Sequence, residues 1–136
     1  MHDKVLVAIL AYNEEKKISE VLGEVTKKFK NILVVDNNSQ DLTCKKVQDF
    51  SVFLIKHKYN LGKSESMKTA LKFAKIKKFK YLAFMDADGQ HKTTDLINIC
   101  EKIYENKSEI IIGYRKNLSY LNLKKRIGTM ILQKIF

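Results

Sequence analysis

Short apolar segments alternate along this chain with segments of amphipathic helical periodicity, and this alternation constrains the fold more than any other feature. The apolar runs at residues 4–10, 31–35, 52–55, 81–85 and 109–112 have the length and composition of buried strands. Helical spacing is found at residues 41–50, 63–76 and 93–104, and in an earlier segment whose apolar face comprises Ile18, Val21, Leu22, Val25 and Phe29. This order predicts an α/β fold, a Rossmann-like, doubly wound, mostly parallel sheet with helices on both faces.

Two further expected helices have apolar faces that the spacing identifies. The helix at residues 63–76 is expected to bury Met67, Ala70, Leu71 and Ala74. The helix at residues 93–104 is expected to bury a second set, formed by Leu96, Ile97, Cys100 and Ile103.

Length and composition indicate one reduced, cytoplasmic domain. The chain has 136 residues and 45% hydrophobic content, which is enough for a core. Its two cysteines, Cys44 and Cys100, lie in expected helices and lack the spacing of metal ligands, which favours free thiols in the cytosol. The apolar opening at residues 5–12 is far shorter than the roughly 20 residues of a membrane span.

The chain is strongly basic, with a formal net charge of +11 and a pI near 9.6. Such a charge suits a nucleic acid, an anionic membrane face or a phosphorylated substrate. Lysines occur in every expected helix, however, so solvation of helix faces is the favoured interpretation. A nucleic-acid partner is disfavoured because no aromatic platform is interleaved with the lysines.

Polar residues follow each expected strand, at residues 11–14, 36–39, 57–63, 86–90 and 113–115. In open α/β sheets ligands bind beyond the carboxyl ends of the strands, so these segments are expected to converge on one binding site. Asp36 and Ser39 also have a local alternative, which is to cap the following helix.

Two aspartates one residue apart, Asp86 and Asp88, end the fourth expected strand. The two carboxylates repel each other when both are ionised and neither is paired, and a bound divalent cation removes the cost of this repulsion. Mg²⁺ or Mn²⁺ takes one or two carboxylates and completes its shell with water and substrate phosphate oxygens. Gly89 permits a tight turn and Gln90 offers a further oxygen, so this Asp-x-Asp motif predicts a metal-bridged diphosphate site.

Four ordered motifs, AYNEE, VVDNNSQDLT, NLGKSESMKTAL and MDADGQH, resemble those of the family 2 inverting glycosyltransferases of GT-A fold. The similarity runs from about Val5 to Arg115 and is closest to the branch that contains dolichyl-phosphate mannose synthases and other polyprenyl-phosphate glycosyltransferases. It implies transfer of a sugar from a nucleoside-diphosphate sugar of the GDP-mannose or UDP-glucose type to a polyprenyl (dolichyl) phosphate with inversion.

The resemblance also implies roles for individual residues. Asp86 and Asp88 match the metal and diphosphate pair, with Gln90 as a further metal ligand, and Arg115 would assist an anionic donor or acceptor as a third catalytic residue. Asp36 matches the aspartate that binds the base, and Lys63 would face the donor. The remaining nucleotide-sugar-binding residues would be those of the first loop, Ala11, Tyr12, Asn13 and Glu14.

Two departures from the family pattern bear on function. Asn37 stands where relatives often have a second acidic residue, which leaves base recognition open. The sequence also ends before the segment in which relatives carry a later aspartate. A polyprenyl phosphate arrives already ionised and needs no general base, so this ending favours a lipid phosphate acceptor over a sugar hydroxyl. The alternative is a noncatalytic nucleotide-sugar-binding domain that needs a partner or a further segment.

Residues 123–136 have the pattern of a basic amphipathic helix, with Leu123, Ile127, Met130 and Ile131 on one side and a cluster of Lys124, Lys125 and Arg126 nearby. We therefore expect a nucleotide-sugar-binding domain at residues 1–117 and a terminal helix at residues 118–136. That helix is expected either to contact the cytosolic membrane face or to pack against the sheet.

Overall fold

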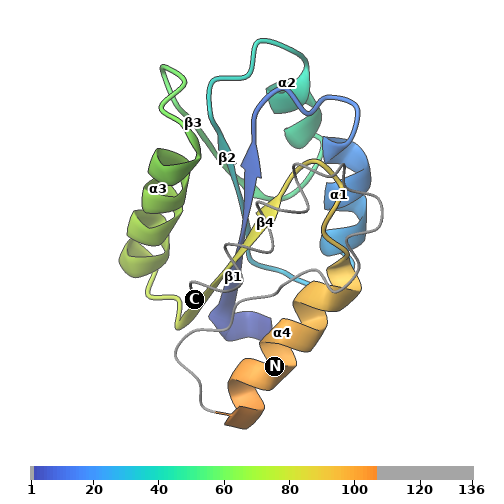
Figure 1. Ribbon diagram of the computed structural model, residues 1–136, viewed down its shortest axis with the longest axis vertical. Helices are drawn as coiled ribbons and strands as arrows, with labels where there is room; N and C mark the ends of the chain where they lie inside the picture. Colours follow the sequence, from blue (N-terminus) through green and yellow to red (C-terminus); the bar gives the residue numbers. More distant parts are fainter. Residues whose placement is uncertain (1, 107–136) are drawn as a thin grey trace, which may run out of the picture.

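A computed structural model describes residues 2–106 of the chain. A short 3₁₀ helix, η1 (His2–Lys4), precedes the first strand. The strands are β1 (Val5–Ala11), β2 (Ile32–Asp36), β3 (Phe53–Lys56) and β4 (Tyr81–Asp86). The helices are α1 (Ile18–Val25), α2 (Thr43–Val47), α3 (Lys63–Ile76) and α4 (Thr93–Asn106). Strands and helices alternate throughout this region (Figure 1).

The four strands form one parallel sheet in the order β3-β2-β1-β4. The chain winds outward from β1 to β2 and β3, and then crosses back so that β4 pairs with the other side of β1. The register aligns the carboxyl ends, because Ala11 pairs with Asp36 and Leu10 pairs with Asp86. The expected doubly wound α/β fold is therefore confirmed, and its topological switch point lies between β1 and β4.

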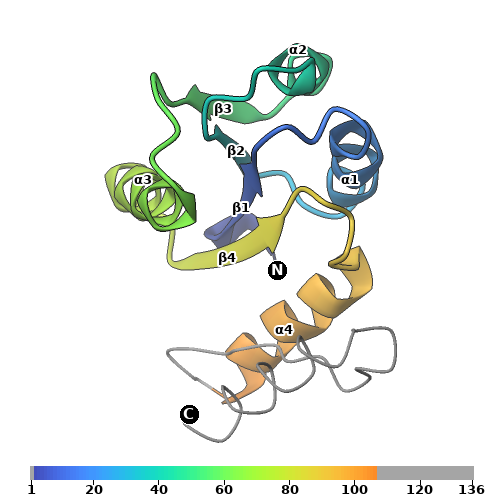
Figure 2. The same ribbon diagram turned by 45° about the horizontal axis from the view of Figure 1, so that its top comes forward.

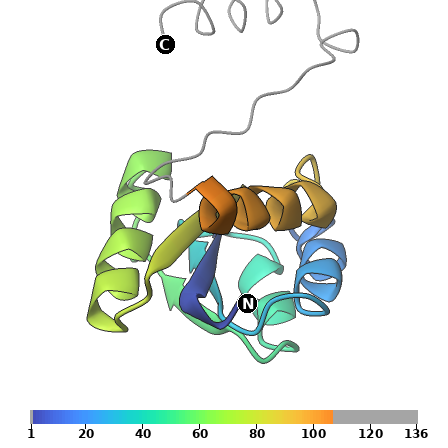
Figure 3. The same cartoon turned by 90° about the horizontal axis from the view of Figure 1, so that it is seen from below.

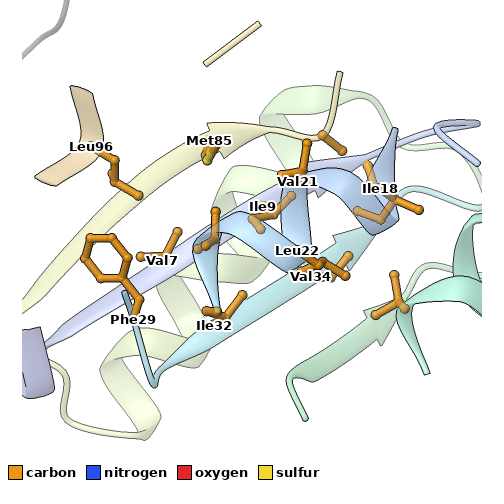
Figure 4. Close-up of a cluster of buried hydrophobic side chains, with 14 of the residues drawn as sticks. Val7, Ile9, Ile18, Val21, Leu22, Phe29, Ile32, Val34, Met85 and Leu96 are labelled. Atoms are coloured by element: carbon orange, nitrogen blue, oxygen red, sulfur yellow. The ribbon is translucent and has the colours of Figure 1, made fainter. Parts of the chain in front are cut away.

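Helices cover both faces of the sheet. Figures 2 and 3 show α3 on one side and α1 on the other. On the α1 side, Val5, Val7 and Ile9 contact a cluster that includes residues of α1, α2 and α4 (Figure 4). The alternate residues Leu6, Ala8 and Leu10 point to the α3 side. All seven residues of β1 are buried, which explains why its sequence is continuously apolar.

Most expected elements are confirmed with small shifts in their bounds. Each observed strand begins or ends within one residue of the expected position, and α3 has the expected bounds. Helix α2 is shorter than the expected 41–50, since residues 41–42 form a hydrogen-bonded loop and residues 48–49 form a turn. The expected strand 109–112, the terminal helix 123–136 and the proposed domain boundary at residue 117 lie outside the described residues.

One expected buried side chain is on the surface. Ala70 and Ala74 of α3 are buried as expected and Met67 is half-buried, but Leu71 is 53% exposed. Ser66 takes part in the buried face instead, because positions 66, 70 and 74 lie on one side of the helix. On α4, Leu96 and Cys100 are buried and Ile97 packs against them, as expected.

The described residues contain no helix that is both long enough and apolar enough to cross a membrane.

Candidate functional site

A cleft of about 370 Å³ opens at the carboxyl ends of β1 and β4, at the upper end of the sheet in Figure 1. It lies at the switch point of the sheet, where open α/β folds bind ligands. Six of the residues assigned from the sequence line it, namely Ala11, Tyr12, Glu14, Lys63, Asp86 and Asp88. The other lining residues are Leu10, Asn37, Asn60, Gly62, Ser66 and Ala87.

The loop after β1 is held in place by the loop after β2. The backbone N–H of Asn13 donates to Ser39 Oγ at 2.9 Å, and that of Glu14 donates to Thr43 Oγ1 at 2.8 Å. Asn13 has a φ of 54°, a left-handed conformation that Asn tolerates better than most residues, and its own Oδ1 accepts from Gln40. Asn13 therefore shapes the loop and does not line the cleft, whereas Tyr12 beside it is 46% exposed.

Asp36 ends β2 on the same edge of the sheet, but its side chain is fully buried. Its carboxylate accepts hydrogen bonds from the backbone N–H of Ser39 at 2.9 Å and from the Ser39 hydroxyl. These contacts close a turn and are not the helix cap that the sequence offered as an alternative, because α2 begins at Thr43 with Leu42 at its N-cap position. Its assignment to the base stays a prediction, since Asp36 does not line the cleft in this conformation.

Asn37, noted in the sequence only as a departure from the family pattern, is the centre of a hydrogen-bond network. Its Oδ1 accepts from the backbone N–H of Leu61 at 2.9 Å and lies 3.1 Å from Nδ1 of His57, while its Nδ2 donates to Asn60 Oδ1 at 2.7 Å. His57 Nε2 in turn lies 2.9 Å from Thr69 Oγ1 on α3. The network ties β2 to the loop that supplies Asn60, Gly62 and Lys63 to the cleft.

The tautomer of His57 follows from these partners. The Leu61 N–H can only donate, so the Asn37 atom that it contacts must be the carbonyl oxygen. His57 Nδ1 must therefore carry the proton, and in the neutral ring Nε2 accepts from the Thr69 hydroxyl. With this tautomer, each of the four contacts pairs a donor with an acceptor.

Lys63 and Asp86 form an ion pair inside the cleft. Lys63 is the first residue of α3 and Asp86 is the last of β4, and Lys63 Nζ lies 2.7 Å from both carboxylate oxygens. The Lys63 side chain is 62% exposed, and exposed pairs contribute only about 0–1 kcal/mol to stability. The pair therefore matters more for the charge it presents to a ligand than for the fold.

A tight turn carries the second aspartate. The backbone N–H of Gln90 donates to Asp88 Oδ1 at 2.9 Å, and Gly89 between them has a φ of 76°. The backbone N–H of Asp86 donates to His91 Nδ1 at 3.1 Å, which closes the loop from its other end. Asp88 lines the cleft in this arrangement, and Gln90 lies beside it outside the cleft lining.

Carboxylates gather in and near the cleft. Burial raises the pKa of Glu14 above its ordinary 4.5, and the nearby charges of Asp88, Asp41 and Asp86 raise that pKa further. Lys63 offsets part of this charge through its pair with Asp86. Three carboxylates, those of Glu14, Asp86 and Asp88, and one lysine therefore line the cleft.

The protein offers only part of a metal-binding shell. Asp86, Asp88 and Gln90 supply oxygen atoms of the kind that Mg²⁺ and Mn²⁺ prefer. Within residues 2–106, however, no group of three or more His, Cys, Asp or Glu side chains is arranged to hold a metal ion. These residues fit a cation whose shell is completed by ligand and water oxygens. Arg115, the remaining assigned residue, lies outside the described region.

Comparison with known proteins identifies the family. Residues 6–131 match the profile of "Glycosyl transferase family 2". The chain belongs to this family. The resemblance that the four motifs indicated is thereby confirmed, and the cleft occupies the position that the motif residues predicted.

Relatives in the family are similar over most of this chain. An uncharacterised protein of Methanocaldococcus jannaschii is 36% identical over 93% of this chain and 54% of its own length. A UDP-N-acetylglucosamine–dolichyl-phosphate N-acetylglucosaminyltransferase of Methanococcus voltae is 30% identical over 96% of this chain and 61% of its own length. The chain thus spans little more than half the length of these curated relatives.

A solved structure shares the fold. Glucosyl-3-phosphoglycerate synthase from Mycobacterium tuberculosis, in complex with uridine diphosphate, superimposes with a TM-score of 0.65 over 95% of this chain and 50% of that chain. The two sequences are 17% identical, so this similarity concerns the fold alone. It agrees with the GT-A architecture that the motifs implied.

Proposed function

We propose that this chain is the donor-binding part of a metal-dependent glycosyltransferase that moves a sugar from a nucleoside-diphosphate sugar to a polyprenyl phosphate with inversion. The observation that supports the proposal most is the cleft at the switch point, with Asp86 and Asp88 beside Lys63. Membership of family 2 and the dolichyl-phosphate relative from Methanococcus voltae agree with it.

The charges of the cleft suit a diphosphate bound together with a cation. Asp86, Asp88 and Gln90 would hold Mg²⁺ or Mn²⁺, which when bound would neutralise the charge of the departing diphosphate. Lys63 sits on the same side and can donate charge-assisted hydrogen bonds to phosphate oxygens. The neutral part of the cleft, with Tyr12, Asn37 and Asn60, would then face the nucleoside.

The acceptor chemistry needs little from the described residues. An oxygen of the ionised lipid phosphate would attack the anomeric carbon, and the bond from that carbon to the nucleoside diphosphate would break with its electron pair. No proton has to leave the nucleophile, so a general base is not required. Arg115, assigned from the family motif, would assist an anionic group in this reaction.

Transfer of radiolabelled sugar to a lipid-extractable product tests the proposal. UDP-glucose, UDP-N-acetylglucosamine and GDP-mannose are offered in turn with a polyprenyl phosphate and Mn²⁺, and a chelator is then added. We expect one donor to react, and Asp88→Asn to lower the rate by about 100-fold or more because the diphosphate loses charge stabilisation. Asp49→Asn is the matched control, since Asp49 is exposed and lies away from the cleft.

A noncatalytic nucleotide-sugar-binding domain is the second candidate. It is favoured by the residues that line the cleft, which are those assigned to donor binding, whereas Arg115 of the catalytic set lies outside the described residues. Nucleotide binding without transfer from any of the three donors would support this candidate. Transfer that persists with the chelator or in Asp88→Asn would contradict the metal-dependent proposal.

A further inference from the structure

Within the described residues, 2–106, the positive charge is concentrated in one structural unit, the strand-loop-helix unit β3–α3. Residues 56–80 contain nine lysines and one acidic residue, Glu65, which is a formal charge of +8, whereas residues 2–106 as a whole carry +5. Residues 1–55 contain eight basic and eight acidic residues and are neutral as a whole. Lysines also occur in or beside the described helices α1, α2 and α4, but acidic residues within or beside those helices balance them. All nine lysines of residues 56–80 are exposed.

Exposed apolar side chains gather in the same unit. Seven large hydrophobic side chains are exposed in the part of the chain that the structure describes, and five of them belong to residues 53–76. They are Phe53, Tyr59, Leu61, Leu71 and Ile76, with exposed fractions of 43%, 72%, 53%, 53% and 76%. Packing in the core therefore does not explain why these positions are apolar. A helix that only had to be solvated by its lysines would not need apolar side chains there.

The two kinds of side chain are interleaved on α3. Leu71 follows Lys68 by three positions and precedes Lys75 by four, so these residues share one face of the helix. Ile76 follows Lys72 by four positions in the same way. At the far end, Lys77 Nζ lies 5.8 Å from the centre of the Phe53 ring. We call the exposed side of residues 56–80 the α3 surface, and Figure 2 shows α3 on its own side of the sheet.

We propose that the α3 surface docks onto an anionic membrane. Lysines attract anionic headgroups, and each lysine near the surface strengthens membrane binding several-fold. Exposed apolar side chains enter the boundary between headgroups and acyl chains. Helix α3 has 14 residues and so extends roughly 20 Å at about 1.5 Å per residue, long enough to lie along a bilayer surface. A nucleic acid would use the lysines but not the exposed Leu61, Leu71 and Ile76.

The α3 surface adjoins the cleft. Asn60, Gly62 and Lys63 line the cleft, and they belong to the loop and helix start that also expose Tyr59 and Leu61. Docking through this unit would place the cleft beside the headgroups, where a polyprenyl phosphate presents its phosphate. This last step rests on the proposed function, whereas docking itself does not require sugar transfer.

Flotation with lipid vesicles tests the docking. The 136-residue chain is mixed with vesicles of phosphatidylglycerol and phosphatidylcholine in equal parts, or of phosphatidylcholine alone. We expect binding to the anionic vesicles that weakens at high salt, and a loss of about tenfold or more in the triple variant Lys68→Glu, Lys72→Glu and Lys75→Glu. The triple variant Lys16→Glu, Lys28→Glu and Lys45→Glu changes the net charge equally from exposed positions on the other side, and should bind nearly as the unmodified chain does.

A second pair of variants tests the apolar contribution. Leu71 and Leu42 are both 53% exposed, but Leu42 precedes α2 and lies away from the α3 surface. Leu71→Gln should weaken vesicle binding several-fold and Leu42→Gln should not. Equal losses in the two triple variants, equal binding to both kinds of vesicle, or no vesicle binding would overturn the proposal. The proposal would also be overturned if the chain bound nucleic acid but not vesicles, and if the Lys68→Glu, Lys72→Glu and Lys75→Glu variant lost that nucleic-acid binding.

Nucleotide titration of the same variants separates this inference from the proposed function. None of the substituted residues lines the cleft, so binding of UDP or GDP should be unchanged in all of them. If the chain docks on vesicles but binds neither nucleotide, the membrane-docking proposal stands and the proposed donor site is refuted.

Discussion

Glu14 is a cleft residue whose ionisation is linked to the stability of the fold. Burial and the charges of Asp88, Asp41 and Asp86 raise its pKa, so the folded chain holds the Glu14 proton more tightly than the unfolded chain does. The stability contributed by this group is therefore complete below its unfolded pKa, and it is lost as the pH rises through the folded pKa. At neutral pH the ionised carboxylate of Glu14 therefore destabilises the fold.

Replacing Glu14 by Gln should raise the thermal midpoint at neutral pH, because the amide carries no charge to bury beside the aspartates. The gain should disappear as the pH falls below 4.5, where the unmodified side chain is itself protonated. Melting curves across this range measure the effect. Glu24→Gln is the control with the opposite sign, because the hydrogen bond from Lys27 lowers the pKa of Glu24. A midpoint for Glu14→Gln that does not exceed that of the unmodified chain at neutral pH would contradict the assignment.

Lys63 is expected to contribute to diphosphate affinity. Lys63→Met keeps the aliphatic part of the side chain but removes the charge that faces Asp86 at 2.7 Å. We expect UDP or GDP to bind about tenfold more weakly or worse, since charge-assisted hydrogen bonds are worth about 1.5–3 kcal/mol. Calorimetric titration measures this. Lys68→Met, five residues further along α3 and outside the cleft, should bind as the unmodified chain does. Equal affinities in the two variants would remove Lys63 from the site.

The sequence identified the acidic residues of the cleft more readily than its amides. Asp86 and Asp88 are recognisable because they interrupt the end of an apolar strand. The importance of Asn37 depends on Asn60 and His57, which lie 23 and 20 positions away, so no local pattern could reveal it. Asp36 illustrates the opposite case, in which a local partner, Ser39, occupies a carboxylate that the family motif assigns to a ligand.

At the scale of elements, two glycines should respond to the same substitution in opposite directions. Gly89 has a φ of 76°, so an alanine there strains the turn between Asp88 and Gln90 even though its Cβ would lie 3.7 Å from the nearest atom. Gly89→Ala should cost about 1–2 kcal/mol of unfolding free energy.

Gly23 lies inside α1 with nothing within 4 Å of an added Cβ, so Gly23→Ala should stabilise the fold by up to about 1 kcal/mol. Urea denaturation of both variants measures the two effects. A destabilised Gly23→Ala would mean that α1 is packed more tightly there than the structure indicates. An unchanged Gly89→Ala would mean that the turn does not hold its left-handed conformation.

Hydrophobic periodicity predicted the elements well because most of them bury one clear face. β1 and β2 are buried along their whole length, so their apolar runs could be recognised directly. Leu71 was misassigned because spacing alone does not distinguish a leucine beside a buried stripe from a member of it; the stripe is formed by Ser66, Ala70 and Ala74. The loop at residues 41–42 replaced the expected start of α2 because Asp41 accepts from the backbone N–H groups of Glu15 and Thr43.

At the scale of the whole molecule, charge and topology organise the described residues around one edge of the sheet. The switch between β1 and β4 creates the cleft, which carries carboxylates, while the neighbouring β3–α3 unit carries the basic surface. Composition revealed the net charge but not where it lies. Locating it requires counting basic and acidic residues within each structural unit, and the structure supplies the bounds of these units. This separation of an acidic cleft from a basic surface agrees with the two proposals, a site for a nucleoside-diphosphate sugar with a cation and a surface that docks on an anionic membrane.

Calorimetric titration of the chain with UDP and GDP, each with Mn²⁺ and then with a chelator, tests the central claim most directly. The account predicts that one nucleotide binds in the presence of the metal, that the chelator abolishes this binding, and that Asp88→Asn loses it while Asp49→Asn retains it. If neither nucleotide binds with the metal present, or if Asp88→Asn binds as well as the unmodified chain, the cleft is not a metal-dependent nucleoside-diphosphate site.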